Sequence, residues 1–505
     1  MRNVEILDTT LRDGEQTAGV AFSAPEKLSI ARKLLEEVKV DRVEIASARV
    51  SQGELECVRA VCEWARDAGL LGRVEVLGFC DDGKSIDWIK EAGATVINLL
   101  AKGSERHCRG QLGRTPSEHF ADVLRNVTMA QQEGLDVNLY LEDWSNGMKD
   151  SKDYVFQMMD ALCHVGIHRF MLPDTLGVLS PRETRQCVRE MVERYPELHF
   201  DYHAHNDYDL AVANVLAAVE EGAKGVHVTV NGLGERAGNA SLASVVAVIA
   251  DMSDAQVHVV EKSINSVSRM VESYSGMALA VNQPVVGENV FTQTAGVHAD
   301  GDKKAGLYVN RLLPERFGRS REYALGKMSG KANIEQNLRM LGISLSEDDM
   351  RKVTLRINEL GDKKEKVTID DLPFIISDVL HHGIKDERIK LVSYMVSTAY
   401  GLHPQAVVKL EVDGKQYEES ATGDGQYDAF VRAVRHIYRN ALGRTFPWLS
   451  NYQVTIPPGG RTDALVQTAI SWLYEGKTYR TRGLDADQTE AAIKATIKML
   501  NLLEE

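Results

Sequence analysis

Two stretches near the start of the chain, VEILDTT at residues 4–10 and PEKLSIARKLLEEV at residues 25–38, define the repeating unit of the fold. The first is rich in β-branched and other apolar residues, which is typical of a buried strand. The second begins with a proline and places apolar residues three or four positions apart, the spacing of an amphipathic helix. The pair therefore predicts a strand followed by a helix that packs against it.

The same alternation continues through the first half of the chain. Further apolar segments, bounded by turn or charged residues, predict strands at 42–47, 73–79, 95–101, 136–142, 168–174, 199–205 and 225–231. Strict alternation of strand and helix implies a parallel sheet with helical crossovers. Eight such units in about 250 residues favour an α/β fold of the (β/α)8 TIM-barrel type. An open, doubly wound sheet is the alternative, and the absence of a GxGxxG motif after the first strand weakens it.

Length and composition limit the classes of protein that remain. At 505 residues the chain is too long for one hydrophobic core, so more than one domain is expected. The net charge of −14 argues against nucleic acid as a partner. No run of about 18 apolar residues occurs, so no membrane partner is expected, and the N-terminus lacks the layout of a signal peptide. Six scattered cysteines without a CxxC pair indicate free thiols and a cytoplasmic location.

Two histidines end the seventh predicted strand, in the segment HAHND that begins at His203. Residues two apart in a strand lie on one face, so His203 and His205 can hold one divalent cation together. Asp13 is the predicted third ligand, because the carboxyl ends of all barrel strands face the same mouth. Asn239 is an outer ligand, a partner that hydrogen-bonds to a ligand, or the cap of a helix that begins near Ala240. The alternative for the two histidines is a polar pair at an exposed strand end.

Three motifs follow the first, seventh and eighth predicted strands in order: RDGEQ (12–16), HAHND (203–207) and GLGERAGNA (232–240). Together with the longer segments LDTTLRDGEQTAGVAFS (7–23) and LYLEDWSNG (139–147), they resemble the family of 2-isopropylmalate, homocitrate and citramalate synthases. The resemblance covers essentially the whole chain. Within the family, the citramalate synthase branch is the most similar.

The resemblance implies an enzyme that condenses its co-substrate acetyl-CoA with a small 2-oxo acid and then hydrolyses the thioester. It implies a divalent metal ion (Mn²⁺, Mg²⁺ or Zn²⁺) bound by Asp13, His203 and His205. It also implies substrate contacts from Arg12, Asp13, Tyr140 and Thr175, acid–base chemistry by Glu142, and an acetyl-CoA side completed by His298 and Tyr308. An arginine suits position 12, since its charge can stabilise negative charge that grows on the ketone oxygen.

Three bulky side chains lie near the ends of consecutive predicted strands: Leu77, Leu100 and Tyr140. Around the side chain of a substrate they would leave room for a methyl group only, because overfilling a packed pocket costs about 1–3 kcal/mol. The resemblance places the same positions around the substrate methyl. Pyruvate is therefore the predicted oxo acid, 2-oxoisovalerate is second and 2-oxoglutarate third. The alternative is that the three residues belong to an ordinary barrel core.

The rest of the chain divides into two further parts. We expect the barrel at residues 1–255, a linker with a helical subdomain at 256–384, and an α+β domain at 385–505. The last part holds a repeat of the ββα type, strand, turn, strand and helix, which suits a homodimer. The resemblance identifies it as a regulatory domain with isoleucine as effector. Tyr427, Asp428 and Tyr452 are the predicted contacts, and hairpin turns or core tyrosines are the alternative.

Two other functions fit parts of the pattern. A metal-dependent lyase or aldolase could use the same barrel, but it would not need the repeated C-terminal domain. A non-catalytic amino-acid sensor with a silent barrel would not need the whole set of Arg12, Asp13, Glu142, His203 and His205.

Overall fold

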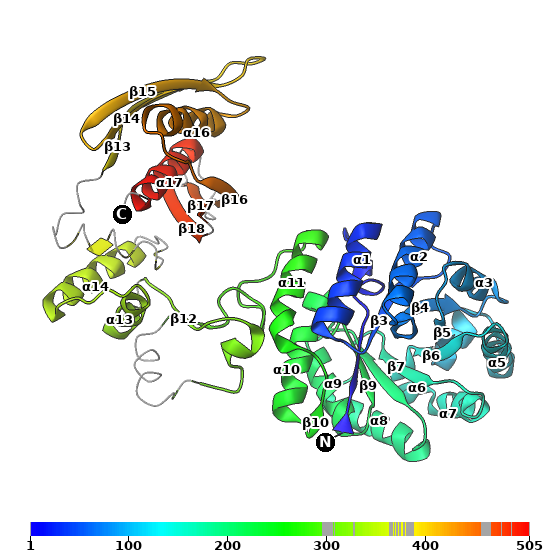
Figure 1. The fold of residues 1–505 in the computed structure, drawn as a ribbon. Helices are drawn as coiled ribbons and strands as arrows, with labels where there is room; N and C mark the ends of the chain where they lie inside the picture. Colours follow the sequence, from blue (N-terminus) through cyan, green and yellow to red (C-terminus); the bar gives the residue numbers. More distant parts are fainter. Residues whose placement is uncertain are drawn as a thin grey trace. The chain divides into compact units, whose positions relative to one another are not determined.

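A computed structural model describes residues 2–294, 307, 309–326, 329–362, 388–455, 466–475, 477–485 and 487–503, and the single positions 367, 369, 372, 375, 376 and 379 (Figure 1). The chain forms two compact units, Met1–Thr292 with Tyr308–Glu322, and Gln293–Leu307 with Tyr323–Glu505. No helix in the described ranges is long and apolar enough to cross a membrane.

The first unit contains a closed barrel of eight parallel strands, which confirms the predicted fold class and rules out the open sheet (Figure 1). Each strand pairs with the next in sequence, and β2 pairs with β9 to close the barrel. The strands are β2 (Glu5–Asp8), β3 (Arg42–Ser47), β4 (Val74–Phe79), β5 (Val96–Lys102), β6 (Asp136–Glu142), β7 (Arg169–Asp174), β8 (Phe200–Ala204) and β9 (Gly225–Val228). β9 is shorter than expected because a 3-10 turn at Val230–Gly232 follows it.

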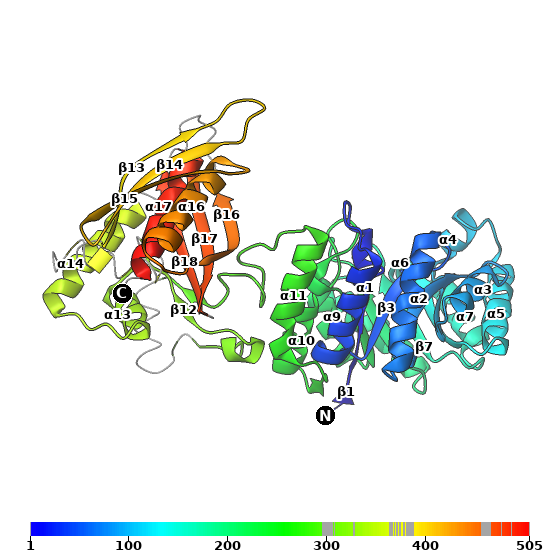
Figure 2. The ribbon, with the colours of Figure 1, turned by 45° about the horizontal axis from the view of Figure 1, so that its top comes forward.

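Helices surround the barrel, and α1 lies between α11 and α2 (Figure 2). They are α1 (Ala24–Arg32, continued by a π-helical turn, Lys33–Val38), α2 (Gln52–Asp67), α3 (Lys84–Glu91), α5 (Pro116–Gln132), α7 (Lys152–Leu162), α8 (Pro181–Arg194), α9 (Ala211–Glu220), α10 (Leu242–Met252) and α11 (Glu261–Ser275). Short helices α4 (Glu105–Gly110) and α6 (Trp144–Asp150) lie in βα loops. Ser23, Thr115 and Ser180 form capping boxes with a glutamate three residues later, which fixes where α1, α5 and α8 begin.

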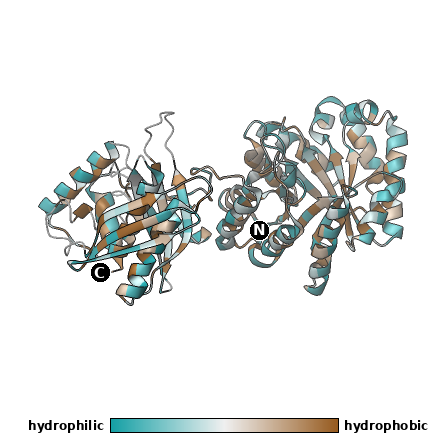
Figure 3. Cartoon of the chain, turned by 90° about the horizontal axis from the view of Figure 1, so that it is seen from above, coloured by the Kyte–Doolittle hydropathy of each residue, from teal (hydrophilic) through white to brown (hydrophobic). Residues whose placement is uncertain are grey.

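The main core lies between strands and helices, where the helices turn their apolar sides inward and their hydrophilic sides outward (Figure 3). The inside of the barrel is different. Arg42 on β3 forms ion pairs with Glu75 on β4 and Asp201 on β8, at 2.9 and 2.5 Å. Since β3 and β8 are not neighbours, these side chains meet inside the barrel. Branched apolar residues usually fill this space, so a charged interior is a feature to be explained.

The second unit contains two helices, α13 (Lys331–Met340) and α14 (Glu347–Asp362), packed around Leu338, Val353 and Ile357. Two repeats follow. The first is β13 (Ile389–Ser397), β14 (Gln405–Val412), β15 (Lys415–Thr422) and α16 (Gln426–His436). The second is β16 (Trp448–Thr455), β17 (Val466–Tyr474), β18 (Lys477–Asp485) and α17 (Gln488–Leu502). Each repeat therefore has one strand more than the predicted ββα unit. β13 escaped prediction because most of its side chains are exposed and show no clear alternation.

Candidate active site

Asp13 is positioned by a tight turn directly after β2. The backbone N–H groups of Arg12, Asp13 and Gly14 all donate to the carbonyl oxygen of Thr9, so the chain folds back over the end of the strand. The buried Lys27 of α1 forms ion pairs with Glu15 and Glu54 and so ties this turn to the helices behind it. As a result the Asp13 carboxylate is only 2% exposed.

The other predicted metal ligands come from β8 and from the loop after β9. His203 lies in β8, and His205 directly follows it, paired with Asn239 in a β-bridge. The loop reaches this position only because of its glycines. Gly238 has a φ of 82°, and a Cβ atom there would lie 1.9 Å from the carbonyl oxygen of Gly232. Asn239 does not cap the next helix, since α10 begins at Leu242 with Ser241 before it.

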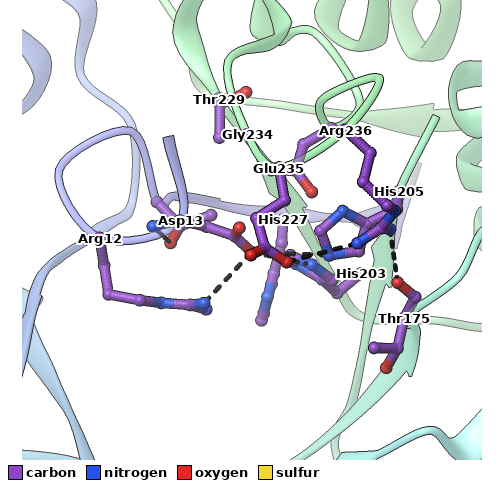
Figure 4. A network of polar contacts seen from close by, with 12 residues as sticks. Arg12, Asp13, Thr175, His203, His205, His227, Thr229, Gly234, Glu235 and Arg236 are labelled. Atoms are coloured by element: carbon purple, nitrogen blue, oxygen red, sulfur yellow. Dashed lines mark hydrogen bonds and ion pairs between the residues drawn. The ribbon is translucent and has the colours of Figure 1, made fainter. Parts of the chain in front are cut away.

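The structure brings Asp13, His203 and His205 together at the barrel mouth (Figure 4). The Nε2 atoms of His203 and His205 lie 3.2 and 3.9 Å from Oδ2 of Asp13. Burial lowers the pKa of His203, and it lowers the pKa of His205 to about 4, which favours neutral imidazoles. Burial alone would raise the pKa of Asp13, but the charge of Arg12 and the hydrogen bond with His203 outweigh it and hold that pKa well below its usual range.

Several atoms of this cluster are buried without a hydrogen-bond partner among the described residues: Oδ1 of Asp13, Oδ1 of Asn239, and Nδ1 of both His203 and His205. Buried polar atoms are rarely unpaired in folded proteins, and a bound ion is one usual reason for an exception. A carboxylate, two imidazoles and an amide oxygen are all ligands of divalent metals. The residues present therefore fit a divalent cation.

Arg12 is held from three sides. Its Nη1 lies 3.2 Å from Oδ2 of Asp13, its Nε donates to Oε2 of Glu44 at 2.6 Å, and its Nη2 donates to the Tyr140 hydroxyl at 3.1 Å. Glu44 is fully buried in β3 and also accepts hydrogen bonds from Thr9 and Asn98. Glu44 was not predicted, although an acidic residue inside the apolar strand RVEIAS is a signal that could have revealed it.

Tyr140 belongs to a small apolar cluster inside the barrel with Leu7, Leu77 and Met171, and Leu100 packs against it. The three residues predicted around the substrate side chain therefore lie together. Tyr140 also lies close to Arg12, whose guanidinium carbon is 5.5 Å from the centre of the Tyr140 ring. Leu7 and Met171 were not predicted, because a strand pattern does not reveal which residues of different strands meet.

Glu142 and Thr175 lie at the ends of their strands but make no hydrogen bond or ion pair to Asp13, His203 or His205 in the described part of the chain. Glu142 forms an ion pair with Lys102, its neighbour across the β5–β6 register. Lys102 was missed by sequence reasoning, since a lysine at a strand end is usually solvated. The carbonyl of Thr175 accepts from Arg236 at 2.8 Å. His298 and Tyr308 lie outside the described residues.

In the second unit, the predicted effector contacts Tyr427, Asp428 and Tyr452 line one cavity of about 650 Å³. The rings of Tyr427 and Tyr452 are 5.4 Å apart. The walls combine α16 of the first repeat with β16 and the start of α17 from the second. A concave site with aromatic walls and a few polar groups is typical of small-molecule binding.

Comparisons with known proteins cover nearly the whole chain. The HMGL-like family model matches residues 3–271, the homocitrate synthase post-HMGL domain-like model matches 285–365, and the LeuA allosteric (dimerisation) domain model matches 366–504. An (R)-citramalate synthase from Methanocaldococcus jannaschii is 33% identical over 99% of both chains. A 2-isopropylmalate synthase from the same organism is 32% identical over 99% of this chain and 94% of its own length. A protein of Methanopyrus kandleri named "Probable 2-isopropylmalate synthase" is 36% identical over 99% of this chain and 98% of its own length.

The HMGL-like barrel with its candidate cation site, joined to a LeuA-type domain, defines a class of acyltransferases that convert an acyl group into an alkyl group on transfer. The chain belongs to the family of 2-isopropylmalate and citramalate synthases. The predicted family and enzyme class are thus confirmed. Acetyl-CoA is the co-substrate of these synthases. The relatives carry both names at similar identity, so they support a condensation of this type without selecting the oxo acid.

Proposed function

We propose that this protein is a citramalate synthase, which condenses acetyl-CoA with pyruvate and releases CoA. The observation that carries the proposal is the apolar cluster of Leu77, Tyr140, Leu7 and Met171 inside the barrel, with Leu100 packed against it. All but Leu100 are at most 5% exposed. A pocket bounded by these side chains suits a methyl group, and each further carbon would have to displace packed atoms at a cost of about 1–3 kcal/mol.

The residues of the site can divide the chemistry between them. A divalent cation bound by Asp13, His203 and His205, with Asn239 as an additional ligand, would polarise the ketone of the oxo acid. Arg12 stabilises the negative charge that develops on the ketone oxygen when the acetyl methyl carbon, having lost a proton, forms the new carbon–carbon bond. Thr175 contacts the oxo acid, and Glu142, held by Lys102, takes part in proton transfer. Water then hydrolyses the thioester, and CoA leaves as the free thiol. His298 and Tyr308 are proposed to act on the acetyl-CoA side.

A 2-isopropylmalate synthase, which uses 2-oxoisovalerate, is the second candidate because relatives with that name are equally similar. The test is the release of free thiol from acetyl-CoA with pyruvate, 2-oxoisovalerate or 2-oxoglutarate, with and without a chelator. We expect the largest kcat/KM with pyruvate and loss of activity on chelation. A larger kcat/KM with 2-oxoisovalerate would reject the citramalate assignment in favour of the second candidate.

We further propose that the cavity lined by Tyr427, Asp428 and Tyr452 binds isoleucine as a feedback inhibitor, and that the protein acts as a cytoplasmic homodimer. The match to a LeuA allosteric (dimerisation) domain supports both regulation and dimerisation. The boundaries 1–255, 256–384 and 385–505 stay a proposal for the three functional parts. Inhibition by isoleucine should weaken in a Tyr452→Ala variant with unchanged uninhibited activity, and equal inhibition in both proteins would reject this site.

A further inference from the structure

A chain of buried polar groups runs through the inside of the barrel towards Arg12, and neither metal binding nor the substrate pocket explains it. His227 on β9 is 1% exposed, and each of its ring nitrogens has one partner. Nε2 lies 3.2 Å from Oδ2 of Asp201 on β8, and Nδ1 lies 3.1 Å from the hydroxyl oxygen of Tyr140 on β6. Because β6 and β9 are not neighbours, this contact crosses the barrel interior. Figure 4 shows His227 beside the cluster of Asp13 and His203.

The direction of each hydrogen bond in this chain follows from the chemistry of its ends. Arg42 Nη2 donates to Oδ2 of Asp201 at 2.5 Å, so Asp201 is an ionised carboxylate that can only accept. Nε2 of His227 therefore carries the proton and donates to Asp201. In the neutral imidazole, Nδ1 is then the acceptor, and the Tyr140 hydroxyl donates to it. The Tyr140 oxygen keeps its lone pairs for Arg12, whose Nη2 donates to it at 3.1 Å.

Glu44 is the only described competitor for the Tyr140 proton, since its Oε2 lies 3.3 Å from the Tyr140 oxygen. Oε2 of Glu44 already accepts from Thr9 Oγ1 at 2.7 Å and from Arg12 Nε at 2.6 Å. An oxygen with two short hydrogen bonds is a weaker partner for a third, longer one. The proton of Tyr140 therefore points to His227.

The backbone leaves space for this arrangement. Gly225 lies two residues before His227 in β9, on the same face of the strand, and pairs with Asp201 in the sheet. A Cβ atom at Gly225 would lie 2.1 Å from Oδ1 of Asp201. Any side chain at position 225 would thus push Asp201 away from His227. The glycine is what permits a buried carboxylate at this place.

We propose that Asp201 and His227 are positioning residues for the condensation: they fix the orientation of the Tyr140 hydroxyl, which in turn aligns the Arg12 guanidinium beside Asp13. This inference rests on the proposed function, since it assigns Arg12 to the charge that grows on the ketone oxygen. Arg12 gains most from alignment in the transition state, when that charge is largest. Loss of the hydrogen bonds that link Asp201 and His227 to Tyr140 should therefore lower kcat more than it raises KM for the oxo acid.

The kinetic test uses His227→Phe, which keeps a ring of similar size but removes both nitrogens. We expect kcat to fall about ten- to a hundredfold, as is typical when a group that orients a functional residue is lost. KM for pyruvate should change much less. His227→Gln, which retains a donor and an acceptor, should recover part of kcat. In a Tyr140→Phe background, His227→Phe should have little further effect on kcat, because the two residues act through the same series of hydrogen bonds.

A matched control is His199→Phe. His199 Nε2 lies 2.9 Å from Oδ1 of Asp201, so this histidine also touches the carboxylate, but it has no contact with Tyr140 in the described part of the chain. Its kcat should stay close to that of the unmodified protein. If His227→Phe lowers only the melting temperature and leaves kcat unchanged, the inference is wrong while the proposed function stands.

A second measurement does not depend on activity. In the protein labelled with ¹⁵N-histidine, the NMR signal that disappears in His227→Gln should be that of an imidazole protonated at Nε2. Asp201→Asn should shift it towards the other tautomer, because an amide can donate as well as accept. Protonation at Nδ1 in the unmodified protein would overturn the inference. If the unmodified protein is inactive with all three oxo acids, the proposed function fails, and this measurement still decides the tautomer.

Discussion

Replacing Leu77 by alanine should change which oxo acid the enzyme prefers. Leu77 is 5% exposed and packs inside the barrel with Tyr140 and Met171. The substitution removes three carbon atoms from this cluster, whereas 2-oxoisovalerate is only two carbon atoms larger than pyruvate. The space opened by the substitution is therefore sufficient for the isopropyl group of the larger substrate.

The expected size of the effect follows from packing energies. A pocket discriminates by roughly 10- to 200-fold for each methylene group. We expect kcat/KM for 2-oxoisovalerate to rise at least about tenfold in Leu77→Ala, and kcat/KM for pyruvate to fall by about tenfold because its methyl group loses contacts. Deleting a buried leucine side chain also costs about 2–5 kcal/mol of unfolding free energy, so the melting temperature should drop.

The assay is thiol release with both oxo acids, and the matched control is Leu99→Ala. Leu99 is fully buried in β5 but belongs to the core between strands and helices rather than to the pocket cluster. It should lose similar stability while keeping the substrate ratio. If Leu77→Ala keeps the ratio of the unmodified protein, or if Leu99→Ala shifts it as much, the cluster does not set specificity.

Three further predictions test a metal ligand, the partner of Glu142, and His119, a buried histidine of α5. His203→Ala should weaken Mn²⁺ binding, measured by calorimetry, by at least about a hundredfold while the circular dichroism spectrum is kept; unchanged affinity would remove His203 from the ligands. Lys102→Met should lower kcat about tenfold because Glu142 loses its partner. Lys90→Met, which breaks the exposed pair with Glu133, should leave kcat unchanged. Equal effects of the two substitutions would reject a specific role for Lys102. Burial lowers the pKa of His119 from 6.5 to about 4. Below pH 6.5 this histidine is therefore protonated in the unfolded chain but not in the folded one. The free energy of unfolding falls as the pH decreases from 6.5 to 4. The His119→Gln variant should therefore lose about 2 kcal/mol less unfolding free energy than the unmodified protein between pH 7 and pH 5, measured by denaturant titration. An unchanged pH dependence would contradict this.

The sequence was sufficient for the barrel because its signals are local and repeated. Each strand is a short apolar segment, and each helix shows its own 3.6-residue spacing, so eight independent patterns pointed to one topology. Asp13, His203 and His205 could be grouped for a related reason. A closed parallel barrel brings all carboxyl strand ends to one mouth, and topology alone then makes distant residues neighbours.

Glu44, Lys102 and His227 could not be found in the same way. Glu44 and His227 contact residues of strands that are not their neighbours, and whether a polar residue faces the barrel interior or the helices depends on register, which a one-residue shift reverses. Lys102 pairs with Glu142 on the next strand, but a lysine at a strand end is usually solvated, so its position did not reveal the pair. The strands β13 and β16 were missed for a different reason. They lie at the edges of their sheets, so half-exposed side chains left no pattern strong enough to separate them from loops.

The charged interior of the barrel is best understood through its cost. Arg42, Glu75 and Asp201 are all buried, and an apolar set of the same volume would often be at least as stable. Stability therefore does not explain why these groups are there. They do fix the direction of each hydrogen bond in the barrel interior. The ion pair with Arg42 keeps Asp201 charged, the charge selects one tautomer of His227, and that tautomer orients Tyr140 and Arg12. An apolar core of the same volume could hold Tyr140 in place, but it could not determine where its hydroxyl proton points, and the guanidinium beside Asp13 would lose a partner of defined orientation.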